Sequence, residues 1–317
     1  MKYRLLTGVA ASGLLLSTGA SAERFTADKI LFDDVTATIE IVTNGGDEID
    51  VTIEQGKTYS QVALSVDDNG LVTVKGAEWK EEDLQDCCND RIRRTVNLRK
   101  DRKVTTGEPV DDKFFADYPT IKVTMPRSTE TSFIDARMKI AMGDLDAALN
   151  LDACYAYGEV GNVEEAVIGV VAGSRLVVGN VEAALELDVS GDADVLVGDA
   201  AMADIDIAGT GDVIVGSLDG MMDVSIAGSG SVRATRLEGP LTVRIAGSGA
   251  VAVQGGRAEK LKATIDGSGG VFFEGAVVGP DLRLSGSPEI RMRSVTGRIA
   301  HVGGGEVFVN DKLVEKK

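Results

Sequence analysis

The sequence predicts an all-β protein, a β-solenoid (β-helix) with about 18–20 residues per rung and Gly-rich corners. The first observation is a Gly-rich phrase with four close copies: Ala208-Gly-Thr-Gly-Asp-Val213, Ala227-Gly-Ser-Gly-Ser-Val232, Ala246-Gly-Ser-Gly-Ala-Val251 and Asp266-Gly-Ser-Gly-Gly-Val271. Weaker copies end at Leu145, Val160, Val177, Val195, Ile290 and Val307. From Val177 onward the final residue recurs after 18, 18, 19, 19, 20, 19 and 17 residues, a period that fits rungs made of short strands.

The second observation is an apolar period of two within each copy, which is typical of strands with one inward face. Eight positions before the final residue stand Leu187, Ile205, Val224, Val243, Ala263, Leu282 and Ile299. Six positions before it stand Val189, Ile207, Ile226, Ile245, Ile265 and Leu284. Each copy therefore predicts two short strands joined at a Gly corner that requires positive φ, with a third, less regular side through segments such as 217–220 and 236–240.

The third observation is composition. Phe, Trp and Tyr make up only 4% of the chain, which suits a narrow interior of Val, Ile, Leu and Ala. The formal net charge is −17, and loss of Lys2 and Arg4 with a signal peptide would make it −19. This acidity argues against nucleic acid or an anionic membrane surface as a partner, because both are polyanions.

Residues 1–22 read as a signal peptide. Lys2 and Arg4 precede the apolar stretch 5–16, which closes on the small-residue site Ala20-Ser21-Ala22. The mature protein is therefore expected to begin at Glu23, to have no integral membrane segment, and to be exported to the periplasm, the cell surface or the extracellular space.

The mature chain divides into four parts. Residues 23–130 are expected to form the first solenoid turns, with strands at 35–41, 51–53, 62–66 and 71–74. Residues 131–309 form the regular solenoid, and 310–317 a charged C-terminal tail. A charged insertion at about 79–118 interrupts the N-terminal part with a basic run: Arg91, Arg93, Arg94, Arg99, Lys100, Arg102 and Lys103. These residues are candidates for binding an anionic glycan or lipid headgroup through bidentate Arg contacts. Alternatively, the run is a solvated segment whose charge is neutralised by acidic residues of the solenoid.

The order of several weak motifs resembles the head GIN domain family of exported bacterial proteins, often labelled auto-transporter adhesins. The motifs are Phe32-Asp-Asp-Val35, the strand 37–42, Val51-Thr-Ile-Glu-Gln-Gly56, Ile121-Lys-Val-Thr-Met-Pro126 and the later Gly-Ser-Gly series. The resemblance implies a right-handed β-helix-like fold, a cell-envelope setting and an adhesin-like role.

The three cysteines differ in their expected roles. Cys154 stands six residues before Val160, so we expect it in the inward column as a buried, small apolar residue. Cys87 and Cys88 are adjacent and are candidates for a vicinal disulfide or an intermolecular bridge. The single histidine, His301, is expected in the same inward column at the end of the solenoid, where capping is favoured over catalysis.

Carboxylates form an ordered constellation on one outward face. Glu186 and Asp188 stand in one rung, Asp204 and Asp206 in the next, and Asp223 with Ser225 in the third. Rungs are about 4.8 Å apart, so these side chains form a ladder of like charges that raises some pKa values or attracts a cation. The alternatives are a solvated face, a loose cation site, and the acid/base pair of a polysaccharide-cleaving enzyme.

The opposite strand of each rung carries apolar residues one position after the final residue of the repeat: Leu196, Ile214, Phe272 and Phe308. These side chains are expected to point outward. They suggest either a face that is covered by another surface or scattered exposed apolar residues.

The sequence favours a non-enzymatic, adhesin-like β-solenoid that presents a binding surface to envelope glycan or a protein partner. The contact candidates are Trp79, Arg91, Arg93 and Arg94, and no cofactor or catalytic residue is expected. Two alternatives stay open: a polysaccharide lyase or hydrolase that uses Asp188, Asp204 and Asp206, and a purely architectural envelope protein. The protein could form oligomers under each of these three readings.

Overall fold

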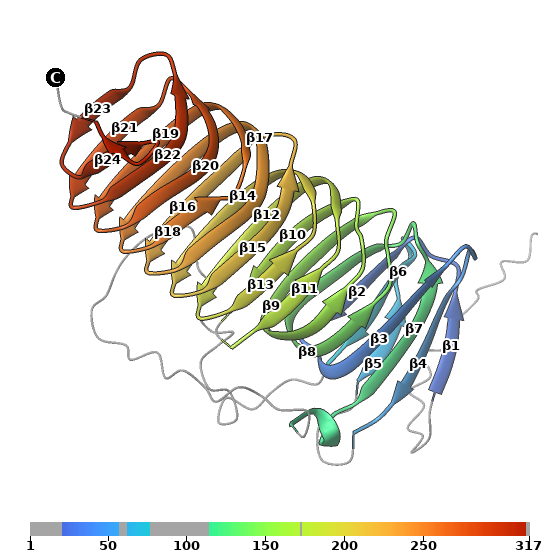
Figure 1. The fold of residues 1–317 in the computed structure, drawn as a ribbon. Helices are drawn as coiled ribbons and strands as arrows, with labels where there is room; N and C mark the ends of the chain where they lie inside the picture. Colours follow the sequence, from blue (N-terminus) through green and yellow to red (C-terminus); the bar gives the residue numbers. More distant parts are fainter. Residues whose placement is uncertain (1–20, 57–61, 77–113, 172, 315–317) are drawn as a thin grey trace, which may run out of the picture.

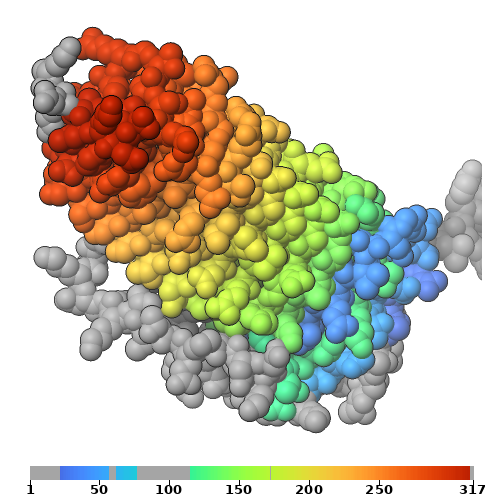
Figure 2. Space-filling model, viewed as in Figure 1, coloured from blue at the N-terminus to red at the C-terminus, as the bar shows by residue number. Residues whose placement is uncertain are grey.

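The computed structural model describes residues 21–56, 62–76, 114–171 and 173–314. They form a β-solenoid of about nine turns, in which the chain climbs from the N-terminal strands to the last rung beside the C-terminus (Figure 1). In the space-filling view the colour bands of successive rungs lie directly against one another (Figure 2). The all-β solenoid predicted from the sequence is confirmed.

Two faces are built from parallel strands in register. The first face contains β10 (Glu165–Val170), β12 (Val181–Gly191), β14 (Ala200–Gly209), β16 (Met222–Gly228), β19 (Gly256–Gly267), β21 (Asp281–Gly286) and β23 (Ala300–Gly303). The second face contains β11 (Arg175–Val178), β13 (Asp194–Val197), β15 (Asp212–Leu218), β18 (Ala250–Val253), β20 (Gly270–Val278), β22 (Glu289–Thr296) and β24 (Glu306–Val309). Three longer strands turn a corner and join both faces: β8 (Glu130–Met142), β9 (Ala148–Val160) and β17 (Ser231–Gly247).

The core is the stack of inward columns predicted from the period of two. On the first face Leu187, Ile205, Val224, Val243, Ala263 and Leu282 lie in one buried column, and Val189, Ile207, Ile226, Ile245, Ile265 and Leu284 in the next. Burial of each Val, Leu or Ile side chain stabilises the fold by about 1.5–3 kcal/mol. Each rung contributes several such residues, so the interior is held by many similar increments.

The strand register predicted from the Gly-rich repeats is wrong at both ends of the solenoid. Leu176, fully buried, pairs with Val195, whereas Val177 points outward. Ala153, and not Cys154, lies in the same inward column as Ile207. The prediction failed here because the Gly-rich repeat, from which the register was predicted, is poorly matched by the sequence before β12.

At the C-terminal end the last corner is two residues shorter than its predecessors. His301 therefore lies opposite Leu282, the column expected for Ile299, and Gly303 takes the place expected for His301. The His301 ring is half-buried, and its Nε2 lies 2.9 Å from the carbonyl oxygen of Gly304, so it helps to close the terminal corner.

Glycines form the first corner column because no side chain fits between the rungs. Gly209, Gly228, Gly247 and Gly267 have φ between 133° and 138°. A Cβ on Gly228 would lie 2.2 Å from the carbonyl oxygen of Gly209 in the rung below. The positive φ expected at these corners is confirmed.

A second corner carries a polar ladder that the sequence analysis missed. The backbone N–H of Asn162 donates to Oδ1 of Asp144, that of Asn180 to Oδ1 of Asn162, and that of Asp199 to Oδ1 of Asn180, over 2.8, 2.8 and 2.9 Å. The N–H of Ser217 then donates to Oδ1 of Asp199. The signal was present, since each of these residues directly follows a glycine: Gly143, Gly161, Gly179, Gly198 and Gly216.

The N-terminal part contains β1 (Ser21–Phe25), β2 (Lys29–Asp33), β3 (Thr36–Asn44), β4 (Ile49–Glu54), β5 (Ala63–Val66), β6 (Leu71–Lys75), the short 3-10 helix η1 (Phe114–Asp117) and β7 (Thr120–Pro126). β2 and β3 pair in parallel with β8, as a first turn of the solenoid would. β4, however, pairs antiparallel with β1 and β7, and β5 with β6. The strands β3, β4, β5 and β6 match the segments predicted as strands, whereas β1, β2 and the antiparallel cap were not predicted.

The C-terminal end is closed by a hairpin. Residues 310–314, expected within a charged tail, turn at Asn310 and Asp311, which both have positive φ, and β25 (Lys312–Leu313) returns antiparallel to β24. Within the described ranges there is no helix long and apolar enough to cross a membrane.

Candidate functional site: the acidic ladder

The acidic ladder consists of Glu186, Asp188, Asp204, Asp206 and Asp223 on the outward side of the first face. Its two columns have the predicted register: Glu186, Asp204 and Asp223 are consecutive partners on β12, β14 and β16, and Asp188 pairs with Asp206, which pairs with Ser225. The residues between them on each strand are buried, so alternation fixes the carboxylates outward. All but the half-buried Asp223 are exposed.

Asp204 occupies the centre of the ladder. Partial burial raises the pKa of its carboxyl, and the negative charges of Asp206, Asp223 and Glu186 raise it further, while Arg244 lowers it. The expectation that stacked carboxylates raise pKa values therefore holds at this residue.

The ladder ends at a cation on its C-terminal side. Arg244 of β17 places Nη1 2.6 Å from Oδ1 of Asp223 and follows Ser225 in the outward column. Lys262 and Arg283 occupy later positions of the two columns. Basic side chains thus follow the carboxylates in both columns toward the C-terminus, although Asp281 comes after Lys262 in one of them.

A sixth carboxylate extends the ladder toward the N-terminus. Asp152 of β9 is the partner of Gly169, which is in turn the partner of Asp188. Asp152 was not predicted as part of the ladder, because Gly169 interrupts the column and the predicted register before β12 is wrong.

The ladder carboxylates were also weak candidates for a cation site. Among the described residues, no group of three or more His, Cys, Asp or Glu side chains is arranged to hold a metal ion. The carboxylates lie side by side on successive parallel strands of one face.

The second face has the predicted outward apolar column. Leu196 and Ile214 are exposed by 44% and 40%, and they are partners on β13 and β15. The column then continues through Arg233, Ala252, Phe272, Arg291 and Phe308. The guanidinium carbon of Arg291 lies 4.6 Å from the centre of the Phe308 ring, so the basic side chain covers the aromatic one.

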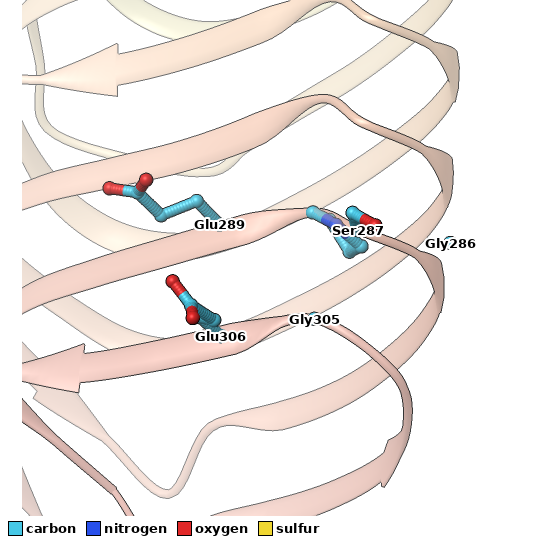
Figure 3. Close-up of a pocket in the computed structure, with 6 residues that line it drawn as sticks. Gly286, Ser287, Glu289, Gly305 and Glu306 are labelled. Atoms are coloured by element: carbon cyan, nitrogen blue, oxygen red, sulfur yellow. The ribbon is translucent and has the colours of Figure 1, made fainter.

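A hollow lies at the corner between the last two rungs (Figure 3). It is lined by Gly286, Ser287, Pro288, Glu289, Gly305 and Glu306, and Glu289 and Glu306 are register partners on β22 and β24. The Glu289 carboxylate contacts the Arg291 guanidinium. The pair is therefore part of an ion cluster at the end of the solenoid.

The contact candidates Trp79, Arg91, Arg93 and Arg94 lie outside the described residues, as do Cys87, Cys88 and the signal peptide, except for Ser21 and Ala22. Cys154 is 4% exposed, so its predicted burial is confirmed. It is not a simple apolar residue, however, because it is disulfide-bonded. Its neighbour Tyr155 is also buried, and the Tyr155 ring centre lies 6.1 Å from that of Phe115 in η1.

Comparisons with known proteins add weak structural similarities. No protein-family model matches the chain, and no curated protein matches it. A "putative lipid binding protein" of Parabacteroides distasonis aligns over 92% of this chain and 96% of its own, with 14% identity and a TM-score of 0.38. A "putative adhesin" of Parabacteroides merdae gives the same coverage and identity with a TM-score of 0.35, and one of Bacteroides fragilis covers 93% and 100% with 14% identity and a TM-score of 0.34. These values are too low to carry a function over to this chain.

Proposed function

We propose that the protein is an exported, non-enzymatic β-solenoid that presents an adhesin-like binding surface to envelope glycan or to a protein partner. The observation that supports this most directly is the unbroken register of the outward columns across β12, β14 and β16. Each outward side chain lies about 4.8 Å from its equivalent in the next rung, so an extended or repeating partner meets similar contacts at every step. The candidate contacts are Trp79 and, on the basic run, Arg91, Arg93 and Arg94.

A second candidate function is cleavage of a polysaccharide by Asp188, Asp204 and Asp206. The raised pKa of Asp204 favours it, because a general acid must hold its proton near the working pH. The geometry favours binding instead. Hydrolysis requires two carboxyl groups that flank the scissile bond, whereas these three are all exposed on the outward side of the first face.

The test is to mix the mature chain, residues 23–317, with anionic and neutral envelope polysaccharides and to separate each mixture on a sizing column. Co-migration with unshortened glycan is the expected result. Shortened glycan would instead identify the second candidate function. If no glycan binds and envelope proteins are not retained by the immobilised chain, the protein is architectural and the proposal is wrong.

Three triple variants separate binding by the basic run from cleavage by the ladder. Replacing Arg91, Arg93 and Arg94 with Ser should weaken glycan binding about tenfold, since charge-assisted bonds to anionic groups are lost. The matched control replaces three exposed arginines outside the ladder columns, Arg233, Arg257 and Arg298, with Ser and should leave binding near the parent level. Replacing Asp188, Asp204 and Asp206 with Asn should abolish any cleavage.

A further inference from the structure

Two exposed methionines lie next to each other on the first face. Met202 of β14 and Met221, which directly precedes β16, are exposed by 44% and 47%. The backbone N–H of Ala203 donates to the carbonyl oxygen of Met221 over 3.0 Å, and Ala203 is the register partner of Met222. The two exposed residues therefore occupy equivalent positions on successive rungs, whose strands are about 4.8 Å apart.

The local sequence explains why both side chains are exposed. Met202 precedes the buried Ala203, and Met221 precedes the buried Met222, and successive side chains of an extended chain point to opposite sides. Gly220, in the rung after Met202, leaves its side uncovered: a Cβ on this glycine would lie 3.7 Å from the Met202 Cβ, but the residue has none. Both thioether side chains therefore point away from the core.

The other methionines of the described ranges are buried in the core: Met125, Met138, Met142, Met222 and Met292. The contrast is sharpest between Met221 and Met222, which are adjacent in the sequence but exposed by 47% and 1%. A dissolved oxidant reaches an exposed sulfur atom far more readily than a buried one. The fold therefore separates the methionines into an accessible pair and a protected group.

Hydrogen peroxide oxidises a thioether in one two-electron step. A lone pair of the sulfur attacks one peroxide oxygen, the O–O bond breaks as the S–O bond forms, and the second oxygen leaves as water with both protons of the peroxide. The sulfur is oxidised to a sulfoxide, and the peroxide is reduced to water. A sulfoxide in the core would lack a polar partner, whereas water solvates one on the surface. Oxidation of the exposed pair is therefore compatible with the intact solenoid.

We propose that Met202 and Met221 form a paired oxidation site on the first face. Each sulfur takes up one oxygen atom from hydrogen peroxide while the buried methionines stay reduced. Asp204 and Asp223 stand two positions further along the same strands, so the modification makes the apolar residues beside these carboxylates polar. This inference goes beyond the proposed function and holds whether or not a glycan binds.

The test treats the mature chain, residues 23–317, with hydrogen peroxide and follows each methionine by tandem mass spectrometry, which distinguishes Met221 from Met222. Met202 and Met221 should gain oxygen at least about tenfold faster than the buried methionines. Once both are oxidised, the Tm measured by circular dichroism should equal that of the untreated chain. Similar rates at exposed and buried methionines, or a lower Tm, would overturn the proposal.

The same treatment in urea that unfolds the chain shows whether the fold is the cause of the selectivity. All methionines should then react at similar rates, and a preference for Met202 and Met221 that persists in urea would contradict the assignment.

Two double variants provide a second readout. Met202→Leu with Met221→Leu removes both accessible sulfurs and should abolish the fast phase of peroxide consumption. The matched change Met138→Leu with Met222→Leu replaces two buried methionines at nearly constant volume and should leave the fast phase in place. A fast phase that survives the first change, or disappears with the second, would contradict the proposal. Circular dichroism verifies that both variants keep the parent fold.

Discussion

Arg244 on β17 reaches back by one rung to Asp223 on β16, and this ion pair closes the acidic ladder at its C-terminal end. The register partner of Arg244 is Ser225, so its guanidinium crosses diagonally to the neighbouring column to meet the carboxylate. The pair is partly exposed and adds little to stability alone. Its larger effect is on Asp204, whose pKa Arg244 lowers against the combined effect of three acidic neighbours and burial.

Replacing Arg244 with Gln should raise the pKa of Asp204 further, because the positive charge that opposes its acidic neighbours is removed. The carboxyl resonance of Asp204, followed by NMR between pH 3 and 8, reports the shift directly. Arg298→Gln, at an exposed arginine outside the ladder, is the matched control and should leave the titration in place. An unchanged Asp204 titration in the Arg244 variant would show that Arg244 does not act on this carboxyl.

Asp204→Asn should stabilise the fold at neutral pH. Its ordinary pKa of 3.8 is raised in the folded chain, so between these two values the native state holds more protons than the unfolded state. Stability contributed by the protonated group is therefore lost as pH rises through that window, and the whole penalty is present at pH 7. The Asn side chain carries no charge and avoids this penalty.

Thermal unfolding followed by circular dichroism at pH 7 and at pH 3.5 tests this sign. The Tm of Asp204→Asn should exceed that of the parent chain at pH 7, and the difference should disappear at pH 3.5. Asp219→Asn, at an exposed position outside the ladder, is the control. A Tm that falls at pH 7 would mean that Asp204 stabilises the fold in its charged form.

Gly228→Ala should destabilise the solenoid by several kcal/mol. The residue has φ of 137°, and a Cβ would lie 2.2 Å from the carbonyl oxygen of Gly209, so the rungs would have to separate. Backbone strain at such a φ costs about 1–3 kcal/mol even before this overlap. Urea unfolding measures the loss, and Gly45→Ala, where a Cβ meets nothing within 4 Å, should be close to neutral. Equal stability of the two variants would contradict the corner geometry.

The regular solenoid could be predicted because its determinants are local. Ile226 and Gly228 are separated by one residue, and the same pair of inward residue and corner glycine recurs at each rung. The pairing of Val51 on β4 with Val123 on β7 could not be read in this way, because an apolar strand looks the same whether its partner is parallel or antiparallel. The ladder from Glu186 to Asp223 was found by the same columns, but Asp152 was missed where Gly169 leaves a position without a side chain.

Phe133→Ala should cost about 3–5 kcal/mol, because the removed ring leaves a cavity between the N-terminal part and the first rung. Phe133 is fully buried, and its ring stacks on that of Phe32 with centres 4.6 Å apart and an angle of 10° between the planes. Phe133→Leu retains most of the volume and should cost less than half as much. Urea unfolding of both variants provides the comparison, and equal losses would mean that stacking rather than volume holds this junction.

Asn180→Ala should destabilise the solenoid by about 1 kcal/mol, because the backbone N–H of Asp199 loses its acceptor at the second corner. The corner places each side-chain oxygen under the N–H of the next rung, so an alanine leaves one donor without a protein partner while the backbone N–H of residue 180 still reaches Asn162. Asn180→Asp keeps an oxygen at the same position and should retain most of the stability, which separates the hydrogen bond from side-chain volume. Urea unfolding of the two variants measures the difference. Equal loss in both would show that the amide nitrogen of Asn180, rather than its oxygen, is what the corner requires.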